Sequence, residues 1–177
     1  MDVHYRKMVV FMTDAMIKNI NELRLLLNKT DDSFLFAHIK NGTSNFDEYS
    51  FGKTYSEFLY ICDGFWLGNV VLYGVKTLKS NQSLASEIEF SKGDWLCIGH
   101  LESGDGYLML KQSTENVYMF YEGYFYKGAG YDNAYCNLGN LESFLTEYVF
   151  GKMYASIACS IEDDEWYNFF KVNNYVS

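Results

Sequence analysis

Three runs of alternating apolar residues constrain the fold of this chain more than any other feature. They are DWLCIGHL at 94–101, GYLMLK at 106–111 and NVYMFY at 116–121. Each run is rich in strand-forming residues, and the gaps between the runs are the size of hairpin loops. They therefore predict three consecutive antiparallel strands. Both alternating faces of WLCIGH are apolar, which is typical of a central strand covered by helices.

Other segments extend this predicted sheet. NVVLYGV at 69–75 predicts a strand before the three runs, and EGYFYKG at 122–128 predicts a half-exposed edge strand after them. Residues 29–53 are ambiguous. Within them, SFLFAHI at 33–39 fits a strand or a helical turn, and NGTSN at 41–45 predicts a loop.

Two segments with apolar residues at helical spacing precede the predicted sheet. Apolar residues recur every three or four positions over 3–28, which predicts an amphipathic helix. TYSEFLYICDG at 54–64 predicts a second, short helix. Thr54 and Glu57 fit a capping box at its start, and Gly64 provides a left-handed stop at its end. One face of this helix is apolar and consists of Tyr55, Phe58, Leu59 and Cys62.

Two more helices are expected near the C-terminal end. In LESFLTEYVF, Asn140 is a suitable N-cap, Glu142 lies in the favourable first turn, and an apolar stripe runs from Leu141 to Val149. SIEDDEWYNFFKV predicts the next helix, with Ser160 as its cap and its aromatic residues facing inward. The acidic run 162–165 is interpreted mainly as a complement to the helix dipole. Its alternative role is a second candidate for a binding surface.

These elements predict the fold class. The 177 residues contain no repeat, low-complexity tract or linker, so one domain is expected over 1–177. The order of elements predicts an α+β domain. Its antiparallel sheet should have about 4–6 strands, packed with an N-terminal helix, a short capped helix and C-terminal helices.

Charge restricts the class of partner. The chain has 14 basic and 23 acidic residues and a net charge of −9, which disfavours nucleic acid as a partner because phosphate binding requires a basic face. Complementary fields favour a basic protein partner, although acidity that serves only solubility is the alternative. The first apolar run has only five residues before Thr13, too few for a signal peptide or a membrane span. A cytoplasmic location is therefore expected.

No recognisable catalytic or metal-binding motif appears. The four cysteines lack CxxC spacing and are expected to be reduced, with Cys62, Cys97 and Cys159 in apolar patterns. Cys97 and His100 resemble a nucleophile and base, but residues three apart on a regular strand face opposite sides. SGDG at 103–106 is interpreted as a hairpin turn. We therefore expect no catalytic residue, no metal, no cofactor and no enzymatic activity.

Aromatic residues are the surplus of this chain: 16 Tyr, 14 Phe and three Trp. Tyrosine suits interfaces because it combines a large rigid area with a hydrogen-bonding tip. Acids and tyrosines are interleaved over 102–135, where an ordinary solvated sheet face is the alternative interpretation. The candidate protein-binding residues are Glu102, Asp105, Glu122, Tyr124, Tyr126 and Asp132.

Several of these segments together resemble the SUKH superfamily, a domain shared by a fungal cell-wall-synthesis regulator and many bacterial immunity proteins. TYSEFLYICDGFWLGNVVLYGVKTL is similar to the family's short helix, which ends in an Asn/Asp-Gly step and leads into the sheet. DWLCIGHLESGDGYLML and NVYMFY are similar to the strands that follow, and LESFLTEYVFGKMY to the closing helix. The resemblance is strongest over 48–155. One departure is FGKT at 51–54, where the family usually has Leu-Pro.

The resemblance implies a function based on binding. It indicates a cytoplasmic antitoxin that binds and neutralises a bacterial toxin domain, often a nuclease, and that needs no catalytic residue or cofactor. The expected partner is a cognate toxin encoded nearby, with no role for nucleic acid or a membrane. An adaptor or regulatory module with the same fold is the alternative, and a hydrolase is less favoured.

Overall fold

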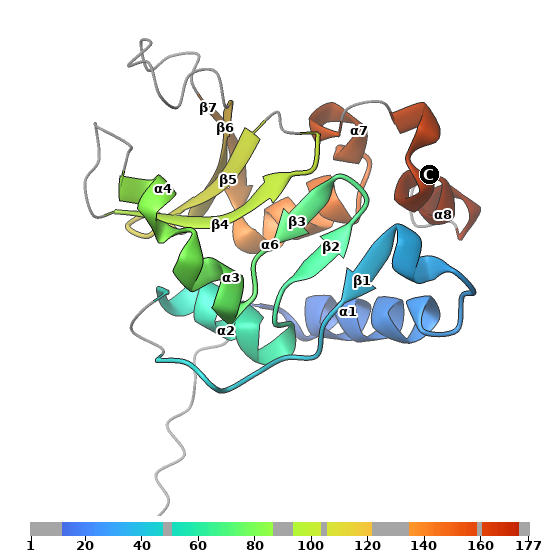
Figure 1. Ribbon diagram of the computed structural model, residues 1–177, viewed down its shortest axis with the longest axis horizontal. Coiled ribbons are helices and arrows are strands. Elements are labelled where there is room, and N and C mark those ends of the chain that lie inside the picture. Colours follow the sequence, from blue (N-terminus) through green and yellow to red (C-terminus); the bar gives the residue numbers. More distant parts are fainter. Residues whose placement is uncertain are drawn as a thin grey trace, which may run out of the picture.

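The computed structural model describes residues 12–47, 51–86, 94–103, 106–121, 135–158 and 161–173. Its centre is a seven-stranded antiparallel sheet in the order β1-β2-β3-β4-β5-β6-β7 (Figure 1). Each strand therefore pairs only with its neighbours in the sequence. The predicted α+β class is confirmed, and the sheet has one strand more than the upper end of the expected range.

The strands differ in length along the sheet. The first three have three residues each and the last four have six or seven. Their bounds are β1 Ala37–Ile39, β2 Phe65–Leu67, β3 Val70–Leu72, β4 Trp95–Leu101, β5 Gly106–Lys111, β6 Asn116–Tyr121 and β7 Tyr135–Asn140.

The three alternating runs form β4, β5 and β6, so their prediction as consecutive antiparallel strands is confirmed. β4 is buried at every position except His100, as the apolar pattern on both faces predicts. The sequence interpretation missed β2 and β7. β2 is short and directly follows a helix, and β7 is built from the polar segment YCNLGN.

Helices surround the sheet in Figure 1, with α1 beneath β1, α3 and α4 beside β4, and α8 near the start of β1. Short 3₁₀ turns and one π-helical stretch complete the described elements. The helical bounds are α1 Asp14–Leu27, η1 Ser33–Leu35, α2 Lys53–Ile61, α3 Val75–Ser80, α4 Gln82–Ser86, α6 Leu141–Ser143, η4 Phe144–Val149, α7 Tyr154–Ile157, η5 Ile161–Asp163 and α8 Glu165–Val172.

α1 follows the predicted amphipathic pattern over the part that the structure describes. Thr13 is its N-cap and accepts a hydrogen bond from the backbone N–H of Met16. The buried residues Met16, Ile20, Leu23 and Leu27 share one face. The first part of the expected helix, residues 3–11, lies outside the described residues.

The capping box predicted for the short helix is wrong. α2 begins at Lys53, and its N-cap is Gly52, which has a φ of 69° and provides no side-chain hydrogen bond. Thr54 therefore lies inside the first turn rather than before it. Its hydroxyl is buried without a hydrogen-bond partner in the described part of the chain.

The end of α2 also differs from the expectation. Its C-cap is Cys62, with extended backbone angles, and the N–H of Cys62 binds the carbonyl of Phe58. Gly64 is left-handed, with a φ of 81°, but it lies two residues beyond this cap. A Cβ atom at Gly64 would come within 2.4 Å of the backbone nitrogen of Gly74. Gly64 therefore allows two chain segments to approach closely and does not cap the helix.

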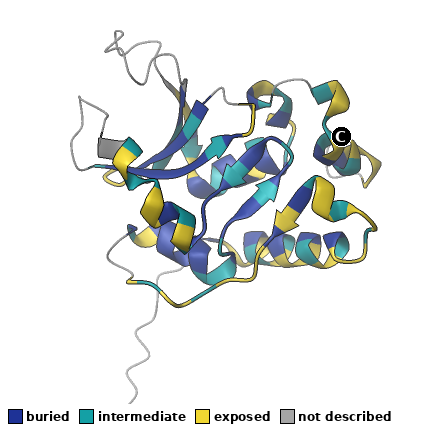
Figure 2. Ribbon diagram, in the orientation of Figure 1, coloured by how far each residue is buried: buried dark blue, intermediate teal, exposed yellow. Residues whose placement is uncertain are grey.

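A continuous series of aromatic ring contacts runs through the described core. The predicted apolar face of α2 and its C-cap is confirmed, because Tyr55, Phe58, Leu59 and Cys62 are all fully buried. Most of α2 has the colour of buried residues in Figure 2. A series of ring contacts leads from α2 through β2 to α8 and η1, and its members are Tyr55, Phe58, Phe65, Phe150, Phe170, Trp166, Phe169 and Phe36.

The C-terminal helices agree in part with those predicted from the sequence. Asn140 is the predicted N-cap and accepts a hydrogen bond from the N–H of Ser143. After a single α-helical turn the backbone continues as the π-helical η4, which the apolar stripe does not predict. α8 is capped by Asp164, and the proposed cap Ser160 lies outside the described residues.

α3 and α4 were not predicted. α4 supplies Gln82, whose side-chain amide accepts a hydrogen bond from the N–H of Cys97 and donates one to the carbonyl of the same residue. β3 reaches β4 only as far as Gly99, so Gln82 takes the place of a neighbouring strand at Cys97.

Candidate functional site

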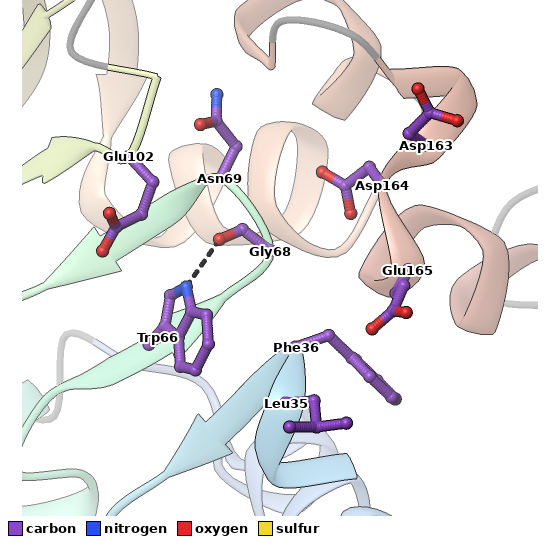
Figure 3. A pocket seen from close by; sticks show the side chains of 9 residues that line it. All are labelled: Leu35, Phe36, Trp66, Gly68, Asn69, Glu102, Asp163, Asp164 and Glu165. Carbon is purple, nitrogen blue, oxygen red and sulfur yellow. Dashed lines mark hydrogen bonds between the residues drawn. The ribbon is translucent and has the colours of Figure 1, made fainter. Parts of the chain in front are cut away.

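An open groove lies where the β2–β3 turn, the β4–β5 turn, η1 and the start of α8 meet (Figure 3). Its volume is about 380 Å³. We call it the acidic groove. It is lined by Leu35, Phe36, Trp66, Gly68, Asn69, Glu102, Asp163, Asp164 and Glu165.

One side of the acidic groove is apolar and aromatic. Leu35, the last residue of η1, is 57% exposed, and Phe36 packs against Phe169 of α8 with 5.6 Å between ring centroids. Trp66, the middle residue of β2, is half-buried, and its indole Nε1 donates a 2.7 Å hydrogen bond to the carbonyl of Gly68. This bond holds the indole ring in one orientation.

The start of α8 forms the acidic side. Asp164 is the N-cap of α8: its Oδ1 accepts from the N–H of Tyr167, and its Oδ2 accepts from the hydroxyl of Tyr154. Both oxygens of Asp164 are therefore occupied. Asp163 and Glu165 are exposed, and neither makes an ion pair or a hydrogen bond through its side chain to another described residue.

Asn69 joins the turns that frame the groove. It is 8% exposed, its Oδ1 accepts from the N–H of Ser103, and its Nδ2 donates to the Ser103 hydroxyl. Its own N–H donates to the hydroxyl of Tyr154, 2.8 Å away. Asn69 and Tyr154 thus connect the β2–β3 turn, the β4–β5 turn and the start of α8 through buried and part-buried hydrogen bonds.

Glu102 faces the start of α8 from the opposite side of the groove (Figure 3). It is exposed, and its Oε1 lies 3.7 Å from Nε2 of His100. The other ring nitrogen of His100, Nδ1, lies 2.9 Å from the hydroxyl of Tyr73. Among the lining residues no basic side chain offsets the acids.

Only one predicted binding residue belongs to this groove. Glu102 lines it, whereas Asp105, Glu122, Tyr124, Tyr126 and Asp132 lie outside the described residues, as does the edge strand expected at 122–128. Asp163 and Glu165 come from the acidic run that was interpreted mainly as a dipole complement. Sequence reasoning missed Trp66 and Phe36 as surface residues, because aromatic residues in strand-like runs are most simply assigned to the core.

The geometric reason for rejecting a Cys97–His100 pair is wrong. A bulge between Cys97 and Gly99 shifts the register of β4. Cys97 then pairs with Met109 and His100 with Tyr107, two residues apart on β5, so both side chains point to the same face. Cys97 is nevertheless fully buried, and both ring nitrogens of His100 face other side chains.

Burial suppresses the ionisation of the described core thiols. It raises the pKa of Cys62 and of Cys97 to about 12 in each case. A thiol that stays protonated is a weak nucleophile and a poor metal ligand. In the described ranges, no group of three His, Cys, Asp or Glu residues is arranged to hold a metal ion.

Comparison with family models, with curated proteins and with solved structures finds no match for this chain. None of the helices in the described segments combines the length and apolar character needed to cross a membrane.

Proposed function

We propose that this protein is a cytoplasmic immunity protein of the SUKH type, which binds a toxin domain and neutralises it without catalysis. The observation that carries the proposal is the acidic groove. It combines exposed carboxylates with an aromatic wall, and this combination suits a basic protein surface.

The net charge supports the same class of partner. At −9, the chain attracts a basic protein over a distance set by ionic strength, and nucleases that bind phosphate are basic. A field of this sign accelerates encounter, while buried aromatic contacts slow dissociation. The toxin class expected from this charge is a nuclease.

The order of the elements supports the family assignment. The segment that resembles the SUKH signature contains the short helix α2, the Asp63-Gly64 step and the strands β2 and β3. β4, β5 and β6 follow as an antiparallel meander. This is the order that the resemblance implies.

The decisive experiment pairs this chain with the product of the adjacent gene. The two proteins are co-expressed, and the chain is tested for co-purification and for protection of cells that produce the toxin. We expect a stable complex and full protection. A complex without protection would favour an adaptor role, and the absence of both would overturn the proposal.

Two sets of variants then locate the interface. The first set neutralises Asp105, Glu122 and Asp132 or truncates Tyr124 and Tyr126. The second set neutralises Glu102, Asp163 and Glu165. Neutralising acidic contacts should lower the association rate and its dependence on salt. Truncating a tyrosine anchor should raise the dissociation rate and cost roughly 1–3 kcal/mol of binding free energy for each tyrosine. The set that weakens binding identifies the surface that the toxin uses.

A further inference from the structure

We propose that the acidic groove binds an arginine side chain of the partner protein, with the guanidinium group against the indole of Trp66 and between the carboxylates of Glu102, Asp163 and Glu165. This inference rests on the proposed function for the identity of the partner, and on the groove itself for the chemistry.

The carboxylates that line the acidic groove favour a cationic ligand. Glu102 lies on one side of the groove and Asp163 and Glu165 on the other, with no basic residue in the lining (Figure 3). The one basic side chain of α8, Lys171, is directed elsewhere: its Nζ lies 4.1 Å from the centre of the Tyr167 ring. Asp163 and Glu165 have no side-chain partner among the described residues, and Glu102 has only His100, 3.7 Å away. A bound cation would therefore lower the repulsion among these three acids.

The aromatic wall favours a planar cation. The hydrogen bond from Nε1 of Trp66 to Gly68 fixes the plane of the indole. Tryptophan is the best ring for cation–π contacts, and a guanidinium group can stack on it while its edge donates to carboxylates. A lysine ammonium is a point charge that cannot use the ring and two opposite carboxylates in the same way.

The size and rigidity of the groove fit one side chain. A volume of about 380 Å³ is near the lower end of the range for small-ligand pockets, roughly 300–1,000 Å³. Its frame is held by the hydrogen bonds of Asn69 and Tyr154, which are buried or part-buried, so little ordering is needed on binding. A preformed pocket of this size suits an arginine that projects from a partner rather than a whole helix.

The test uses acetyl-arginine methylamide as the probe, titrated at low salt into the full ¹⁵N-labelled chain. The chain has three Trp residues, and Trp66→Phe assigns the indole signal of Trp66. We expect saturable shifts of this signal and of the amide signals of Gly68 and Glu165. The citrulline derivative has the same shape without the charge and should cause no shift. Equal shifts with both derivatives, or tighter binding of the lysine derivative, would overturn the inference.

A matched pair of variants separates the groove from the general field. Asp163→Asn with Glu165→Gln removes two groove carboxylates, and we expect the dissociation constant of the arginine derivative to rise about fivefold. Asp31→Asn with Glu162→Gln makes the same change of net charge outside the groove lining. This control should alter the dissociation constant of the arginine derivative less than twofold. Equal losses in both variants would show that only the overall field attracts the probe.

The two proposals can fail separately. If the probe binds in the groove but the chain gives no protection from the toxin, the immunity function fails and the arginine site stands. If the chain protects cells but the probe does not bind in the groove, the immunity function stands and the arginine site fails.

Discussion

The hydroxyl group of Tyr154 donates a 2.6 Å hydrogen bond to Oδ2 of Asp164 and accepts a 2.8 Å hydrogen bond from the backbone N–H of Asn69. This one oxygen atom therefore ties the start of α8 to the β2–β3 turn. The Tyr154 ring is 1% exposed, so water cannot replace either bond without rearrangement.

Tyr154→Phe should lower the free energy of unfolding by about 1–3 kcal/mol, because it leaves the buried N–H of Asn69 without its acceptor. Urea denaturation measures the loss. Tyr167→Phe is the matched control, since the Tyr167 ring stacks on Tyr154 and its hydroxyl makes no hydrogen bond among the described residues. If both variants lose the same stability, the bridge at Tyr154 contributes nothing specific.

Gly68→Ala should be more destabilising than Gly52→Ala. Both glycines have positive φ angles, 55° and 69°, so each substitution costs about 1–3 kcal/mol of backbone strain. A Cβ atom at Gly68 would also lie 2.4 Å from the Tyr154 hydroxyl, whereas the nearest atom to one at Gly52 is 3.8 Å away. Thermal unfolding of the two variants compares them. Equal melting temperatures would show that the turn moves to accommodate the methyl group.

Phe58→Ala should cost about 3–5 kcal/mol in urea unfolding, because Phe58 is fully buried between Tyr55 and Phe65. Leu25→Ala serves as the control. Leu25 is 59% exposed on α1, and its loss should stay within about 0.5 kcal/mol. A loss below about 1 kcal/mol for Phe58→Ala would show that α2 is not part of the core.

The cysteines should differ in reactivity towards a thiol reagent. Cys136 is exposed and should be labelled quickly in the native protein, while Cys62 and Cys97 are buried and should react only after unfolding. Cys159, outside the described residues, is predicted from its apolar context to be slow. Peptide mapping by mass spectrometry after a short labelling pulse identifies the modified sites. Rapid labelling of Cys62 or Cys97 would contradict the burial of these thiols.

Stability should fall as the pH rises above about 9. The pKa of Cys62 and of Cys97 is about 12 in the folded protein and 9.0 for an unburied thiol. Between these values the folded state keeps protons that the unfolded state loses, so the free energy of unfolding decreases with pH. For each thiol the slope rises towards roughly 1.4 kcal/mol per pH unit as the unfolded thiol becomes fully ionised. Replacing both by Ala should flatten the curve from about pH 9, where unfolded thiols with a pKa of 9.0 ionise ahead of unburied tyrosines with a pKa of 10.0. If the slope of the unfolding free energy against pH did not change in this variant, the pH dependence would arise from groups other than the two thiols.

The two-residue alternation of apolar residues and the short turn sequences between the runs were sufficient to predict the centre of the sheet. The alternation in 94–121 identifies β4, β5 and β6, because long strands repeat the pattern often enough to distinguish it from a helix. Strands of three residues, such as β1 and β2, provide too few repeats for this test. β7 lacks β-branched residues and is placed by its pairing with β6, a tertiary effect.

Local sequence was a poor guide to the ends of α2 and to the acidic groove. Thr54 and Glu57 have the spacing of a capping box, but the left-handed Gly52 starts the helix before Thr54 can cap it. The groove combines residues from Leu35 to Glu165, and no single segment contains its pattern. The one available signal was the acidic run 162–165, which a helix-dipole role explains equally well.

The meander of the sheet has a kinetic consequence. The hairpins β2–β3, β4–β5 and β5–β6 are joined by short turns, so their contacts are local and we expect them to form early in folding. The acidic groove instead requires η1 and the start of α8, segments near opposite ends of the described chain, to meet beside the turns of a finished sheet. A nascent chain still lacking α8 therefore has its hairpins but no groove. The binding of a partner that we propose for this groove should therefore appear only with the last folding step, and an incomplete copy should not bind that partner.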